Sequence, residues 1–114
     1  SQSVIRAVIK EMHLDKEIYK YKQCILEYLV IKKDALASNF SLKHIAFAKK
    51  NRHNRFISEA YISRSLFFMQ SQVKDSAIFY ANLATDFAKR SDTKICLALS
   101  LHHQAKVNFF LEIR

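Results

Sequence analysis

The chain has 114 residues, half of them apolar and a quarter charged, and its formal net charge is +9. It contains no glycine and no proline, which argues against hairpin-rich β folds and phosphate-cradling loops because both depend on residues that adopt positive φ. No apolar run reaches the roughly 18 residues that a membrane span requires. Cys24 and Cys96 lack CxxC spacing, so we expect reduced core thiols in a cytoplasmic protein.

Apolar residues at steps of three and four predict helices along the whole chain. The expected segments are the end of an earlier helix and then five helices, at about 2–12, 15–31, 35–50, 55–70, 75–90 and 93–112. The expected helix caps are Asp15, Asn54, and Ser91 or Asp92, and Asp75 lies near the start of its helix. His44 falls on a packing face and is expected to be a hydrogen-bonded core residue. In the last helix we expect a packing stripe of Leu97, Leu101, Ala105 and Phe109. The short connections predict that neighbouring helices are antiparallel.

One phrase of the sequence recurs after 40 residues, since FAKK at 47–50 returns as FAKR at 87–90. Self-similarity at a period of about 20 to 50 residues is typical of solenoids, in which each unit buries its apolar face against its neighbours. We therefore predict an all-α solenoid of antiparallel helix pairs with a repeat of about 40 residues. Its expected parts are the end of a preceding helix (1–13), a first repeat (14–53), a second repeat (54–92) and an A-type or capping helix (93–114). The chain would then be a fragment of a longer array.

The residues at packing positions resemble the tetratricopeptide repeat, whose helix pairs alternate bulky, small and aromatic residues. The second repeat places Tyr61, Ser65, Phe68, Ala77, Ala81 and Ala84 at the motif positions. The first repeat is looser, with Tyr21, Ile25, Tyr28, Ala37, Ser41 and His44. The period exceeds the usual one of about 34, and the phrase at 74–80 is similar to repeats attached to bacterial histidine kinases and helix-turn-helix regulators. The resemblance implies an interaction module, the sensory or scaffolding part of a bacterial transcriptional regulator or signalling protein.

The resemblance also implies a binding site, because in this family the first helices of the pairs line a concave groove. The positions not used for packing are Lys22, Gln23, Leu26, Glu59, Ile62, Ser63, Leu66, His102, His103 and Lys106. The carboxylate clamp of the family is absent, since Leu26 follows Lys22 where the clamp has an asparagine. Apolar residues among polar ones suit an amphipathic peptide or protein segment. Alternatively, these positions contact only water or the next repeat.

Basic residues form a second pattern, which we call the basic edge. It comprises Lys49, Lys50, Arg52, Arg55, Lys89, Arg90 and Lys94. A helical-repeat nucleic-acid binder would use such an edge for phosphate contacts, and this is the alternative function. Cations near helix C-termini also offset the helix dipole, which is a purely structural explanation.

Enzymatic signatures are missing from the sequence. The histidines show no paired metal spacing, and the adjacent His102 and His103 point about 100° apart on a helix. No serine or cysteine is presented on a nucleophile turn. We therefore expect no enzymatic activity, catalytic residue, metal or cofactor, and no membrane partner. Self-association through the ends of the stack is a further possibility.

Overall fold

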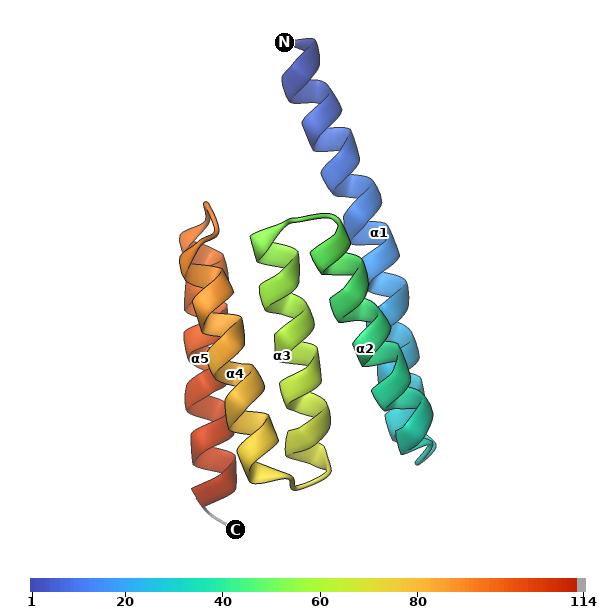
Figure 1. The fold of residues 1–114 in the computed structure, drawn as a ribbon, viewed down its shortest axis with the longest axis vertical. Coiled ribbons are helices and arrows are strands. Elements are labelled where there is room, and N and C mark those ends of the chain that lie inside the picture. The colour runs from blue at the N-terminus through green and yellow to red at the C-terminus, as the bar shows by residue number, and fades with distance from the viewer. Residues whose placement is uncertain (113–114) are drawn as a thin grey trace.

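The computed structural model describes residues 1–112, and over this range the chain forms five α-helices and no strand. The helices are α1 (Gln2–Val30), α2 (Asp34–Lys50), α3 (Asn54–Gln70), α4 (Lys74–Lys89) and α5 (Lys94–Glu112). Each runs antiparallel to the one before it, and α3 stands between the α1–α2 and α4–α5 pairs (Figure 1). The all-α prediction is confirmed. No helix in the described range combines the length and the apolarity needed to cross a bilayer.

The predicted helix boundary near Asp15 is wrong, because α1 continues unbroken from Gln2 to Val30. Nothing in this stretch interrupts a helix, since it contains neither glycine nor proline. Leu14 and Ile18 are both buried and lie four residues apart, on one face of the helix. The first half of α1 projects beyond the other helices (Figure 1), so residues 2–12 are the beginning of this helix and not the end of a separate one.

Two predicted caps are also wrong by one or two residues. Asn54 is the first residue of α3, and the ring Nδ1 of His53 accepts the Phe56 N–H at 3.5 Å. At the start of α5, Thr93 Oγ1 accepts the Cys96 N–H at 3.2 Å. In both cases the capping acceptor is three residues before the N–H that it satisfies, as capping geometry requires. The hydroxyl of Ser91 instead donates to the Ala88 carbonyl, 2.7 Å away, and closes the end of α4.

The turns after α1, α2 and α3 are built without glycine. Lys32, Arg52 and Gln72 have φ angles of 63°, 50° and 61°. After α1, the Lys33 N–H donates to the Tyr28 carbonyl at 2.8 Å; after α3, the Val73 N–H donates in the same way to Phe68 at 2.9 Å. These are Schellman-type helix ends, which satisfy carbonyls that the last helical turn would leave unpaired.

The core consists of two clusters on either side of α3. The first joins α1, α2 and α3 through residues such as Ile18, Ile45 and Phe56, and the second joins α3, α4 and α5 through Met69, Ala81 and Val107. Alanines that are nearly inaccessible to solvent, Ala37, Ala48, Ala77 and Ala88, let α2 and α4 approach their neighbours closely. Cys96 is buried but Cys24 only partly, and both are free thiols.

The predicted stripe on α5 is wrong. Leu101 and Phe109 are exposed, with 48% and 66% of their surface accessible, and Ala105 is exposed as well. The buried residues of α5 are instead Cys96, Ser100, His103 and Val107. Leu101, Ala105 and Phe109 therefore lie away from the core, while Val107 packs in the second core cluster and Ser100 and His103 are buried with it.

Candidate functional site: a groove between α1, α3 and α5

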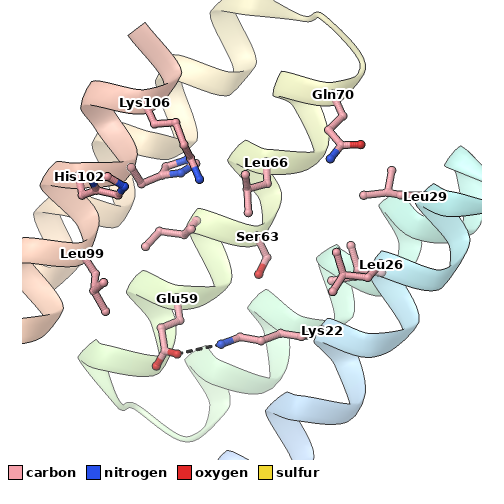
Figure 2. A pocket seen from close by; sticks show the side chains of 13 residues that line it. Lys22, Leu26, Leu29, Glu59, Ser63, Leu66, Gln70, Leu99, His102 and Lys106 are labelled. Carbon is pink, nitrogen blue, oxygen red and sulfur yellow. Dashed lines mark hydrogen bonds and ion pairs between the residues drawn. The ribbon is translucent and has the colours of Figure 1, made fainter. Parts of the chain in front are cut away.

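Three helices line an open groove whose cavity measures about 380 Å³. Its walls are mainly aliphatic, with Leu26 and Leu29 from α1, Leu66 from α3 and Leu99 from α5 (Figure 2). Leu26 and Leu99 are 55% and 57% exposed, so these side chains are not used to hold the helices together. Exposed leucines that converge on one cavity are a feature of recognition sites for apolar groups.

The structure brings together all of the predicted groove residues except Gln23. Those that line the cavity are Lys22, Leu26, Glu59, Ile62, Ser63, Leu66, His102, His103 and Lys106. Gln23 lies elsewhere on α1, and its amide donates to the Tyr19 hydroxyl. That these positions bind a ligand remains a prediction.

Sequence reasoning missed four further lining residues: Ile25, Leu29, Gln70 and Leu99. Three of them follow from helical spacing. Leu29 is three residues after Leu26, Gln70 is four after Leu66, and Leu99 is three before His102. Positions three and four apart share one face of a helix, so extending each predicted stripe by one turn would have found them.

An ion-pair network closes one end of the groove. Lys22 Nζ lies 2.9 Å from Glu59 Oε1 and joins α1 to α3 (Figure 2). The other carboxylate oxygen of Glu59 lies 3.3 Å from Arg55 Nη1. Arg55 also pairs with Glu11 and Asp15 of α1. The hydrogen bond from Arg55 is the main cause that lowers the pKa of Glu11. Glu59 is therefore held by two cations, and α1 is tied to the start of α3.

The opposite end of the groove carries Lys106 on α5 and Gln70 on α3 (Figure 2). Both side chains are exposed. Within residues 1–112, no acidic group forms an ion pair with Lys106. The groove thus has a neutralised cation at one end and an unneutralised one at the other.

His103 supports the wall of the groove from inside. It is only 3% exposed, and its Nε2 lies 2.8 Å from the hydroxyl oxygen of Ser65. That hydroxyl donates its proton to the Ala77 carbonyl at 2.7 Å, so it accepts the N–H of the imidazole. Burial, with smaller contributions from Lys106 and His102, lowers the pKa of His103 to about 4. The ring is therefore neutral at physiological pH and links α5 to α3 and α4, whereas His102 faces solvent.

The basic edge lies at the end of the molecule where α2 and α4 finish and α3 and α5 begin (Figure 1). Three of its members have partners within the chain. Arg55 is in the network described above, the Lys49 ammonium lies 5.6 Å from the centre of the Tyr61 ring, and the Arg90 guanidinium lies 4.6 Å from that of Phe87. The others, Lys50, Arg52, Lys89 and Lys94, are exposed.

A second cavity, of about 370 Å³, lies at this end of the molecule. Arg52, Arg55 and Arg90 line it together with two acids, Glu11 and Asp92. A phosphate entering there would meet carboxylates as well as guanidinium groups. This mixture makes the second cavity a poorer anion site than the count of arginines suggests.

Among the described residues, no group of three or more histidines, cysteines or acidic residues is placed to hold a metal ion. No protein-family model, curated protein or solved structure matches the chain. The groove and the arrangement of the helices are therefore the features of the molecule that indicate a function.

Proposed function

We propose that the chain is a protein-interaction module that binds a peptide or protein segment in the groove between α1, α3 and α5. The observation that carries this proposal is the set of leucines around one open cavity, supplied by three different helices, of which Leu26 and Leu99 are more than half exposed. A segment with apolar side chains would cover these leucines, and such burial contributes about 25 cal/mol per Å². We assign it no catalytic role.

We further propose that the helices form a tetratricopeptide-like solenoid with a repeat of about 40 residues. Aromatic contacts support this, because two pairs recur 40 positions later with similar geometry. Tyr21–Phe47 and Tyr61–Phe87 both have ring centroids 5.6 Å apart. Tyr28–Phe40 and Phe68–Tyr80 are stacked at 5.5 and 5.7 Å. In this arrangement α1, α3 and α5 are the groove-lining helices.

The wider role follows from the resemblance of 74–80 to repeats in bacterial regulators. We propose that the chain is the sensory or scaffolding part of a cytoplasmic transcriptional regulator or signalling protein. Recognition of a protein segment would then be the input that such a part supplies.

Peptide-display selection against the protein tests the groove directly. We expect selected peptides to lose binding on Leu26→Ser, because this change removes an exposed apolar contact without opening a cavity in the core. Leu42→Ser is the matched control, since Leu42 is 46% exposed on α2 and does not line the groove. If the selected peptides respond equally to both changes, or to neither, the groove is not the binding site.

Nucleic-acid binding remains the second candidate, favoured by the cations that gather at one end of the molecule. The free members of the basic edge are the ones to change, because replacing Arg55 would also break the network of α1 and α3. If this end binds phosphates, the combined substitution of Lys50, Arg52 and Lys89 by serine will weaken the gel shift of an oligonucleotide. The wild-type shift will also fall steeply with salt. An unchanged shift would exclude this function for the basic edge.

A further inference from the structure

We propose that the segment bound in the groove is acidic, and that its carboxylates pair with Lys106 at one end and with Lys22 at the other. This inference rests on the proposed function and names the chemistry of the partner. Its apolar side chains would fill the space between the two lysines, against Leu26, Leu66 and Leu99.

Lys106 is a cation in the groove without an acidic partner. Its side chain lines the cavity and is exposed, and no carboxylate in residues 1–112 neutralises it. Burial lowers the pKa of His103, and the charge of Lys106 lowers it further. That imidazole is neutral and cannot compete for an incoming anion. A carboxylate placed beside Lys106 would therefore gain an ion pair without breaking one.

Lys22 supplies the second half through an exchange of partners. It is paired with Glu59 at 2.9 Å, but Glu59 is held independently by Arg55 at 3.3 Å. If Lys22 turns to a carboxylate of the ligand, Glu59 keeps a cationic partner and is not left as an uncompensated charge. Such an exchange costs little free energy, because the large penalty arises only when a partly buried charge is left without a partner.

The charges around the groove favour an acidic segment over a second copy of this chain as the ligand. The exposed apolar stripe on the first half of α1, which includes Val4 and Val8, could in principle enter the groove of a second copy. Its exposed residues 1–10 carry Arg6 and Lys10 and no acid, so they would bring cations towards Lys22 and Lys106. The chain as a whole is strongly basic, with a net charge of +9, which steers acidic partners towards it.

The test uses three synthetic amphipathic peptides of about 14 residues, roughly four helical turns. They share one leucine face and carry glutamate, glutamine or lysine at the remaining positions. Affinities are measured by fluorescence polarisation with the full chain and its variants.

We expect the glutamate peptide to bind most tightly. Lys106→Ala should weaken the binding of this peptide about fivefold, as for a partly exposed ion pair. Lys106→Glu should weaken it further and improve binding of the lysine peptide. Lys89→Glu, an exposed lysine away from the groove, is the control for net charge.

The outcomes separate the two proposals. If the glutamine peptide binds as tightly as the glutamate peptide and both require Leu26, the acidic preference is wrong and the groove stands. If no peptide shows binding that Leu26→Ser abolishes, both proposals fail. If Lys89→Glu weakens binding as much as Lys106→Glu, the attraction is due to net charge and the inference is wrong. A peptide of residues 1–13 that outcompetes the glutamate peptide would make a second copy the occupant and would also overturn it.

Discussion

At the scale of single residues, His44 is buried in the core as expected but lacks the hydrogen bonds that were expected for it. It is fully buried, as the sequence predicted, and it stacks on Tyr21 with ring centroids 5.9 Å apart. The expected hydrogen bonds are not formed, because neither ring nitrogen has a partner among the described residues. Burial, assisted by the nearby Lys22, lowers the pKa of His44 to about 4. Ala84 stands 40 residues after His44 and has no side-chain polar atom to satisfy.

The buried histidines predict a loss of stability in mild acid. His44 and His103 have folded pKa values near 4, against about 6.5 in the unfolded chain. Between these limits the unfolded state binds protons that the folded state does not, so the free energy of unfolding falls as the pH falls. Each histidine contributes up to about 1.4 kcal/mol per pH unit in this window. Urea denaturation at pH 7, 6 and 5 measures the slope.

His44→Phe should remove about half of this slope and keep the contact with Tyr21. It should also raise stability at pH 7 by about 1 kcal/mol, because two unpaired polar atoms leave the core. His13→Gln is the control, since His13 is exposed and is not among the groups that influence His44 or His103. Equal slopes for wild type and His44→Phe between pH 5 and 7 would contradict the assignment.

Arg64 is a residue that pattern reasoning missed altogether. It is only 8% exposed, and its Nη1 donates to the Ser38 carbonyl and to the hydroxyls of Ser38 and Ser41, which ties α3 to α2. Its guanidinium also lies 4.7 Å from the centre of the Phe68 ring. Hydrophobic periodicity assigns an arginine to the surface, so only the structure reveals this contact.

Arg64→Ala should lower the free energy of unfolding by about 2 to 4 kcal/mol, because it removes a buried anchor and leaves the hydroxyls that it bridges with fewer partners. Arg90→Ala is the matched control, since Arg90 is exposed and stacks only on Phe87. Chemical denaturation of both variants gives the comparison. A loss below 1 kcal/mol at position 64 would mean that the bonds of this guanidinium are not important for stability.

At the scale of elements, four helix bodies were predicted to within one residue, because strong apolar periodicity and short connections leave little choice. The start of α1 was predicted wrongly. A residue suited to capping at position 15 does not start a new helix when no helix-breaking residue precedes it. The three turns with positive φ were not predicted either. Helix ends with a positive φ usually contain glycine, and this chain places Lys32, Arg52 and Gln72 there.

The positive φ angles of these turns predict that replacing the residue at such a position by glycine will stabilise the protein. Gln72 has φ of 61°, a conformation that costs a residue with a Cβ atom about 1 to 2 kcal/mol. Gln72→Gly removes this cost but increases the freedom of the unfolded chain, so a net gain of about 0.5 to 1 kcal/mol is expected. Gln70→Gly, two residues earlier in the last turn of α3, should destabilise instead. Thermal melts followed by circular dichroism measure both, and a loss on Gln72→Gly would contradict the explanation.

At the scale of the whole molecule, nine of the ten residues that the resemblance implied for a groove line one cavity, to which α1, α3 and α5 all contribute. Most lining residues could therefore be named without a structure, because residues three and four apart share one face of a helix. The ion-pair network could not, because it joins Arg55 to Glu11 and depends on α1 being one continuous helix. Nor could the buried face of α5, where the polar Ser100 and His103 lie beside the apolar Val107.

The continuity of α1 makes the molecule longer than a compact chain of its size. Its Cα radius of gyration is 14.6 Å and its extents are 52 × 28 × 17 Å, whereas a compact domain of this length has a radius of about 13 Å. Residues 1–10 are all exposed and lie in the part of α1 that projects beyond the other helices (Figure 1).

Deleting residues 1–10 would shorten this helix by about 15 Å. Small-angle scattering should therefore show a radius of gyration about 1 Å smaller. The melting temperature should change by less than about 2 °C, because no buried side chain is lost. Deletion of residues 1–20 is the contrasting variant, since it removes Leu14, Ile18 and Glu11 and should unfold much of the first core cluster. A large fall in melting temperature after the shorter deletion would show that the first ten residues pack against the rest of the protein in solution.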